Sequence, residues 1–223
     1  MIKVCRYARE NMIPYLGICL GMQVAVIEFC RNVLGIPTAH SKEFSETKED
    51  VITTMDDTDY NNLGGTLRLG AKTTLIPDLN SLAYKIYGQE KISERHRHRY
   101  EVNPNYVEKM ENKGLIFSGK DSESNRMEIC EIPSHPFFFA TQFHPEFKTN
   151  PFHPVPSFSA FILCASKQYD KFKVYGEKRY LGINEIENTD DHKPISSISE
   201  DFNSMIKTIL ENNKKIAHLC ENS

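Results

Sequence analysis

The chain has 223 residues, of which 39% are hydrophobic, and a formal net charge of −3. This length and composition suffice for one domain with a core, or for a domain with an extension. The slightly acidic balance gives no electrostatic case for binding nucleic acid or a membrane surface, and no apolar run is long enough to span a membrane. Six cysteines without a C-x-x-C pair argue against a zinc site and against a disulfide scaffold. Since the first residues also do not resemble a signal peptide, we expect a cytoplasmic protein.

The first predicted elements are a short helix and a short strand. Residues 2–11 interleave basic with apolar residues and end just before Pro14, which predicts a helix that stops near residue 11. Residues 15–18 (Tyr-Leu-Gly-Ile) predict a strand, and from Met22 onward apolar residues recur at helix spacing. The chain therefore passes directly from a strand into a helix near Cys19.

Cys19 is the first candidate catalytic residue. It is the centre of a G-x-C-x-G pattern, which is the cysteine form of the nucleophile elbow, a sharp turn between a strand and a helix. We expect Gly17 and Gly21 to be required there, because Cβ atoms would collide in so tight a turn. The positive end of the following helix would favour a thiolate. The alternative is a buried cysteine that acts as a small hydrophobic residue.

Several shorter elements follow. Polar residues 38–50 predict a loop, and the β-branched run 51–55 predicts a strand. The glycines of residues 63–70 match no phosphate-binding pattern and predict a turn between two strands. The remaining elements are also predicted from their apolar patterns: helices over 80–87, 105–112 and 158–166, and paired strands over 115–119 and 127–132.

Residues 95–102 run Arg-His-Arg-His-Arg-Tyr-Glu-Val. In a strand, this alternation would place Arg95, Arg97 and Arg99 on one face and both histidines on the other. A row of guanidinium groups suits a carboxylate or phosphate ligand, but a surface row of salt bridges explains the pattern as well. The stretch is too short, in a chain with no basic excess, to indicate nucleic-acid binding.

The second chemical signal follows a continuous apolar run, residues 137–143, which is typical of a buried strand. If Pro145 is extended, the side chains of His144 and Glu146 point the same way at the end of this strand. An imidazole oriented by a carboxylate is the base half of a Cys-His-Glu relay. Zinc deaminases also carry H-x-E, but the P-C-x-x-C that they need is absent.

The domain prediction divides the chain into three parts. Residues 1–175 are predicted to form an α/β domain, residues 176–201 a polar linker, and residues 202–220 an amphipathic helix that packs on the domain, binds a partner, or folds only on contact. A parallel sheet normally has strands on both sides of its nucleophile strand, and the residues upstream of Tyr15 supply none. Either the sheet is built only from later strands, or the chain is a fragment with an exposed sheet edge.

These residues together resemble a known family. Residues 15–23 (YLGICLGMQ) and the later His144-Pro145-Glu146 resemble the triad-type, class I glutamine amidotransferases. Within these, the resemblance is to the CTP synthase family and extends over residues 7–166, with the motifs LGGTLRLGA (63–71), ERHRHRYEVN (94–103) and TQFHPEF (141–147). It implies a flavodoxin-like α/β sheet flanked by helices, here lacking its first strands, with a helical tail.

The resemblance also implies roles for individual residues. Cys19 would attack the side-chain amide of L-glutamine to form a glutamyl thioester, His144 would shuttle the protons and Glu146 would orient His144. The Leu20 backbone N–H would be an oxyanion donor. The residues implied in glutamine binding are Leu20, Gly21, Met22, Gln23, Glu43 and Arg99, where Glu43 would bind the α-ammonium group and Arg99 the α-carboxylate.

The family uses its ammonia in a separate ligase domain, which aminates UTP to CTP with ATP and magnesium. We therefore expect no cofactor or metal in this chain, a ligase domain in cis or in trans as partner, and a homo-oligomer for the complete enzyme. The segment that supplies the second oxyanion donor has no counterpart here, and such a loss typically costs about 100- to 1,000-fold in turnover. Two alternatives follow: a non-catalytic scaffolding relative that binds a partner through the 202–220 helix, and a Cys-His-Glu hydrolase of γ-glutamyl compounds.

Overall fold

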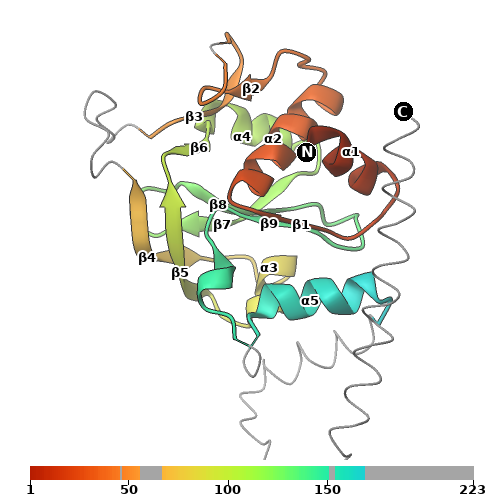
Figure 1. Ribbon diagram of the computed structural model, residues 1–223, viewed down its shortest axis with the longest axis vertical. Helices are drawn as coiled ribbons and strands as arrows, with labels where there is room; N and C mark the ends of the chain where they lie inside the picture. The colour runs from red at the N-terminus through yellow and green to blue at the C-terminus, as the bar shows by residue number, and fades with distance from the viewer. Residues whose placement is uncertain (46, 56–66, 151–153, 169–223) are drawn as a thin grey trace, which may run out of the picture. The chain divides into compact units, whose positions relative to one another are not determined.

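The computed structural model describes residues 1–45, 47–55, 67–150 and 154–168. A first compact unit comprises Met1–Phe161, and a second unit begins at Ile162. The predicted linker and C-terminal helix, residues 176–201 and 202–220, lie outside the described residues. The first unit has the predicted α/β architecture, a mixed sheet with helices on both faces (Figure 1).

The main sheet has six strands in the order β1-β9-β8-β7-β4-β5. Their bounds are β1 Tyr15–Ile18, β9 Phe138–Thr141, β8 Met127–Glu131, β7 Ile116–Asp121, β4 Arg68–Leu75 and β5 Lys91–His98. Only β1 and β9 run parallel, and every other neighbouring pair is antiparallel. Within the described part of the chain, β1 lies at one edge and pairs only with β9. The strands that make up this sheet with β1 all come later in the sequence than β1.

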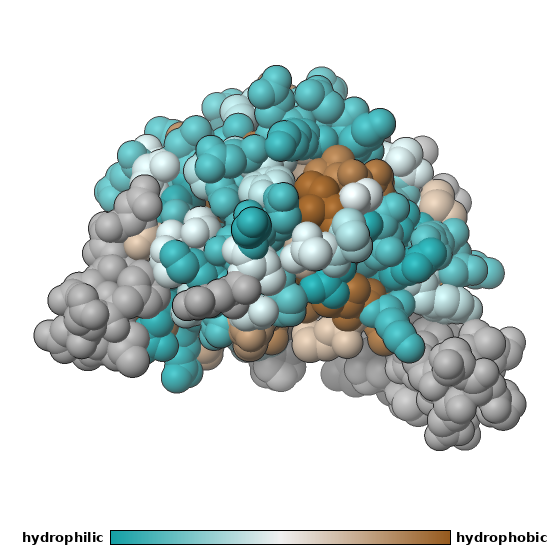
Figure 2. Space-filling view, turned by 90° about the horizontal axis from the view of Figure 1, so that it is seen from above, coloured by the Kyte–Doolittle hydropathy of each residue, from teal (hydrophilic) through white to brown (hydrophobic). Residues whose placement is uncertain are grey.

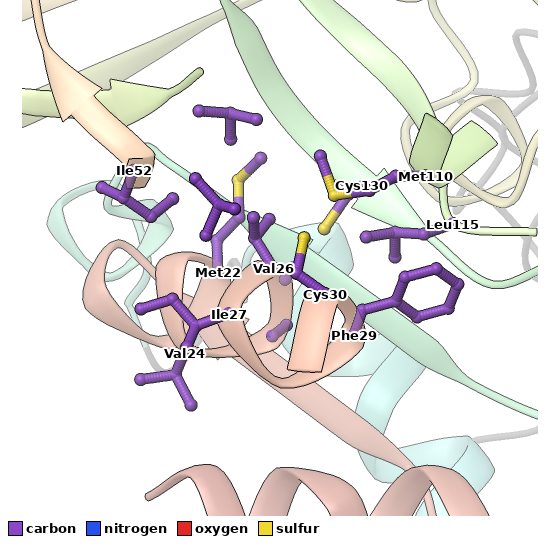
Figure 3. Packing of buried hydrophobic residues seen from close by; sticks show 14 of the residues in the cluster. Met22, Val24, Val26, Ile27, Phe29, Cys30, Ile52, Met110, Leu115 and Cys130 are labelled. Atoms are coloured by element: carbon purple, nitrogen blue, oxygen red, sulfur yellow. The ribbon is translucent and has the colours of Figure 1, made fainter. Parts of the chain in front are cut away.

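Helices α1 (Ile2–Glu10) and α2 (Leu20–Asn32) cover one face of this sheet, and α3 (Leu82–Tyr87) covers the other (Figure 1). On the face of α2, the core consists of apolar side chains that α2 shares with the sheet and with neighbouring elements (Figure 3). Met22, Val26 and Cys30 of α2 are fully buried there, as is Cys130 of β8. Residues 21–30 of α2 are all buried, because the helix is packed between the sheet and α1. The helix that carries the elbow is therefore held firmly.

A second, three-stranded sheet has the order β2-β3-β6, with β2 His40–Ser41, β3 Asp50–Thr54 and β6 Tyr100–Val102. The prediction of a loop over residues 38–50 is wrong at β2, which pairs in parallel with β3. Two polar residues show no periodic pattern, so this strand is defined only by its tertiary partner. The paired glycines of the predicted turn over 63–70 lie outside the described residues, and a strand follows them as expected, since β4 begins at Arg68.

The other predicted elements are confirmed to within a few residues. They include α3, α4 (Pro104–Glu111), the β7–β8 pair and α5 (Pro156–Ala165). Asn103 caps α4 by accepting a hydrogen bond from the Asn105 backbone N–H at 3.0 Å. The face shown in Figure 2 is mainly hydrophilic, with small hydrophobic areas between polar side chains. None of the helices in the described residues is long and apolar enough to cross a membrane.

Candidate active site

The elbow forms as predicted, with Cys19 between β1 and α2. Cys19 has φ 51°, a left-handed backbone conformation that residues other than glycine seldom adopt. The turn is held on both sides: the Cys19 N–H donates to Thr141 O at 2.7 Å, and Cys19 O accepts from the Met22 N–H at 3.0 Å. A strained residue held in this way is typical of a functional position.

The two glycines of the elbow differ in their surroundings. A Cβ at Gly17 would lie 2.8 Å from the carbonyl carbon of Gly21 and 2.9 Å from its oxygen, so only glycine fits there. A Cβ at Gly21 would meet only the Tyr15 hydroxyl, at 3.8 Å. The predicted steric requirement is right for Gly17 and wrong for Gly21, because the close approach involves the backbone of Gly21 and not its missing side chain.

The Cys19 sulfur lies in a half-buried position with two N–H donors. Burial, the largest cause, raises the pKa of the Cys19 thiol above its usual value. Hydrogen bonds from the Leu20 backbone N–H and from the Gln142 side chain lower it, and the carboxylates of Glu146 and Glu43 raise it. The predicted preference for a thiolate is therefore outweighed by burial in the free protein, although the two N–H donors that would stabilise a thiolate are present.

His144 and Glu146 do come together, but not in the predicted way. His144 Nδ1 lies 2.6 Å from Glu146 Oε1. Residues Pro145–Phe147 form a 3-10 turn, η1, so the expectation of an extended Pro145 is wrong and the turn brings the two side chains together. The His144 backbone N–H donates to Arg95 O at 2.8 Å, which attaches this turn to β5.

This geometry selects the tautomer of His144. With Nδ1–H donating to the Glu146 carboxylate, neutral His144 carries its free lone pair on Nε2. Nε2 is buried and has no hydrogen-bond partner among the described residues. It forms no hydrogen bond with Cys19 Sγ, whose partners include the Leu20 backbone N–H, Gln142 Nε2 at 3.6 Å and Arg97 O at 4.0 Å. Such catalytic contacts often tighten only when substrate is bound.

A pocket of about 380 Å³ opens beside Cys19. Its lining includes the sequence-predicted residues Cys19, Leu20, Gln23, Glu43 and Arg99, together with Phe44, Leu67, Arg97, His98 and Tyr100. The pocket thus combines a carboxylate and guanidinium groups with the sulfur, which suits the two charged groups of an amino acid. Gly21 and Met22 do not line it, and the Met22 side chain is in the hydrophobic core, so only the backbone of these two residues could contact a ligand.

The arginine row forms only in part. Along β5, the two kinds of side chain lie on opposite faces as the alternation predicted, with Arg95 and Arg97 exposed and His96 and His98 buried. Arg99 lies beyond the end of β5, between it and β6, and is half-buried in the pocket wall. A bend at Arg99 between the two strands interrupts the alternation, although Arg97 and Arg99 both line the pocket.

The buried histidines belong to a polar network that the sequence did not predict. His96 Nδ1 lies 3.1 Å from His98 Nε2, and His98 Nδ1 lies 2.9 Å from Tyr100 O. On the other side, His96 is next to Glu128, which pairs with Arg68 at 2.8 Å. Burial lowers the pKa of His96 to about 3 and that of His98 to about 4, so both are neutral at pH 7.

Gln142 is the contact of Cys19 that sequence reasoning missed. It lies within the apolar run that ends at His144, and a polar residue in a buried strand is itself a signal, because such a side chain needs a partner. In the described residues, no group of three or more His, Cys, Asp or Glu side chains could hold a metal ion.

Comparison with known proteins identifies the family. The model of the family "Glutamine amidotransferase class-I" matches residues 1–164. The chain is 53% identical over 169 residues to the CTP synthase of Archaeoglobus fulgidus, and 53% identical over 168 residues to that of Staphylococcus carnosus. Each alignment covers 74% of this chain and 31% of the relative, so the chain spans about a third of the length of these proteins.

Among solved structures, the chain is similar to the glutaminase domain of Trypanosoma brucei CTPS with bound acivicin. The TM-score is 0.70 at 43% identity, and the match covers 74% of this chain and 65% of that domain. The family match over residues 1–164 includes the elbow and the strand that leads to His144. The chain belongs to the glutamine amidotransferase class-I family.

Proposed function

We propose that this chain is the glutaminase part of a CTP synthase. It hydrolyses L-glutamine and supplies the ammonia with which a ligase domain, in cis or in trans, aminates UTP to CTP at the expense of ATP. The observation that carries this proposal is the pocket in which Glu43 and Arg99 lie around Cys19. It offers opposite charges for the α-ammonium and α-carboxylate groups, with a nucleophile in the same pocket.

In the proposed reaction, His144 Nε2 accepts the thiol proton as the Cys19 sulfur attacks the side-chain amide carbon of glutamine. The Leu20 backbone N–H, already directed at the sulfur, stabilises the oxyanion. The C–N bond then breaks, and the imidazolium gives its proton to the leaving ammonia. Water, deprotonated by His144, hydrolyses the thioester to glutamate and frees the thiol.

Glu146 supports both proton transfers by accepting the Nδ1–H of His144, which keeps Nε2 free and stabilises the imidazolium. Gln23, with the backbone of Gly21 and Met22 at the start of α2, would contact the substrate chain. The raised thiol pKa is not an obstacle, because a general base removes the proton during the attack rather than before it.

The test is glutamate release by the purified chain and by its Cys19→Ala variant. We expect the variant to lose at least about 1,000-fold of the activity, as is usual when a nucleophile is removed. Cys30→Ala is the matched control, since Cys30 is a fully buried cysteine of the same helix and lies outside the pocket. It should keep its activity. A folded wild-type chain that releases no glutamate would refute hydrolysis by this chain alone.

A non-catalytic scaffolding relative is the second candidate. It is favoured by the edge position of β1 and by the lack of a hydrogen bond between His144 and Cys19 Sγ. It predicts partner binding that survives Cys19→Ala and is lost when residues 202–220 are removed. The domain limit at residue 175, the homo-oligomeric complete enzyme and the cytoplasmic location belong to the first proposal and stay predictions.

A further inference from the structure

Two buried glutamine side chains connect the pocket wall to the Cys19 sulfur. Gln23 is 4% exposed and Gln142 is 1% exposed. The Gln23 amide nitrogen lies 3.3 Å from Tyr100 O and 3.4 Å from Gln142 Oε1, and Gln142 Nε2 lies 3.6 Å from Cys19 Sγ. Because neither side chain is open to solvent, water cannot replace these contacts without a rearrangement.

The orientation of both amides follows from one carbonyl. Tyr100 O can only accept hydrogen bonds, so the group of Gln23 that faces it must be the amide NH₂. The second N–H of that group points at Gln142, which must therefore present its oxygen. The opposite side of the Gln142 amide, its NH₂, is then directed at the sulfur. The Gln142 main chain is held separately, since its N–H donates to Glu128 O at 2.8 Å.

Tyr100 O is itself fixed by the buried histidine pair. His98 Nδ1 lies 2.9 Å from this oxygen, and His98 Nε2 is in turn 3.1 Å from His96 Nδ1. A continuous series of hydrogen bonds thus leads from the β5 interior through Tyr100 O, Gln23 and Gln142 to Cys19. None of these contacts is needed to form the turn of the elbow, which its own backbone bonds already hold.

We propose that Gln142 is a positioning residue for the nucleophile: its amide N–H, oriented by Gln23, holds the Cys19 sulfur and stabilises its thiolate. A donor directed at sulfur strengthens as negative charge develops, because hydrogen bonds to ionised groups are about twice as strong as neutral ones. A purely structural role would require only that Gln142 fill its space just beyond the end of β9. The proposal depends on the proposed function only in taking Cys19 as the reacting group.

The test measures the thiolate directly and needs no glutamine. Cys19 is alkylated with iodoacetamide over a range of pH, and modification is followed by mass spectrometry of the peptide that contains Cys19. Gln142→Met keeps the approximate volume and removes the donor. We expect the pH midpoint of alkylation to rise by about one unit, which makes alkylation below the midpoint about tenfold slower. Gln142→Leu should act in the same direction.

Gln23→Met should raise the midpoint less, because it frees the Gln142 amide to rotate without removing it. The Gln23→Met/Gln142→Met double variant should shift no further than Gln142→Met alone, since the two amides act in series. Ser118→Ala is the control. It removes a buried hydrogen bond, 2.7 Å to Glu131, that belongs to neither amide, and should leave the midpoint unchanged.

An unchanged midpoint in a Gln142 variant that unfolds at the wild-type temperature would overturn the proposal. If neither Gln142 variant folds, the Gln23→Met variant tests the proposal instead. Because Gln23 orients the Gln142 amide, this variant must also raise the pH midpoint of alkylation, and an unchanged midpoint would overturn the proposal. If the wild-type chain releases glutamate and the Gln142 variants have an unchanged pH midpoint of Cys19 alkylation, the role of Gln142 is refuted and the proposed function stands. If the midpoint shifts in the variants but the wild-type chain releases no glutamate, the role of Gln142 stands and the proposed function is refuted.

Discussion

Replacing Gly17 by alanine should destabilise the protein through one contact with backbone atoms. The new Cβ would lie 2.8 Å and 2.9 Å from the carbonyl carbon and oxygen of Gly21, and 2.9 Å from Tyr15 Cε1. The aromatic ring can turn, but the Gly21 carbonyl belongs to the first turn of α2 and accepts the Tyr15 hydroxyl at 2.8 Å. Because β1 is paired with β9 and α2 is buried, neither the Gly17 backbone nor the Gly21 backbone can move apart to relieve the contact. We therefore expect the free energy of unfolding to fall by about 3 kcal/mol, the upper end for overpacking.

Gly21→Ala is the matched control four residues away. Its Cβ would meet only the Tyr15 hydroxyl at 3.8 Å, and Gly21 is within a helix with an ordinary backbone conformation. Alanine there should stabilise by about 0.5–1 kcal/mol through helix propensity. Urea unfolding with unchanged m values measures both free energies of unfolding. Equal stabilities of the two variants would refute the argument from the close approach at Gly17.

Two further predictions concern buried charged and titratable groups. Arg9→Met removes the two hydrogen bonds of 2.8 and 2.9 Å that Arg9 donates to the fully buried Glu28 carboxylate, which keeps the one from Asn32 at 3.1 Å, and should cost about 3–5 kcal/mol in urea unfolding because the charge loses its cationic partner. Arg6→Met, which breaks only an exposed pair of the same helix, should cost about 0.5 kcal/mol or less, and similar costs would contradict the reasoning. Because burial lowers the pKa of His96 to about 3 and of His98 to about 4, the unfolded chain binds their protons at higher pH than the folded chain. The free energy of unfolding should therefore fall as the pH drops from about 6.5 to 4, by up to about 1.4 kcal/mol per unit for each histidine. Replacing both histidines by glutamine should flatten this part of the stability curve, and an unchanged slope would show that other groups cause it.

The sequence by itself determined the elements whose signal is local. The strand-to-helix switch around Cys19 is apparent because apolar spacing changes there from a short run to a helical period. The alternation of Arg and His in β5 predicted that the two kinds of side chain lie on opposite faces, since successive side chains of a strand point to opposite faces. The candidate residues Cys19, His144 and Glu146 were likewise found from short motifs, because their chemistry depends on residue types at a fixed spacing.

Only the tertiary structure decided the features that depend on contacts between distant residues. Strand β2 exists because it pairs with β3, and the requirement for Gly17 arises from its approach to the backbone of Gly21. The contact between Gln142 and Cys19 joins residues 123 positions apart, and no spacing rule could indicate it. Sequence periodicity encodes which face of an element is buried, whereas the partner that it meets is set by how the whole chain packs.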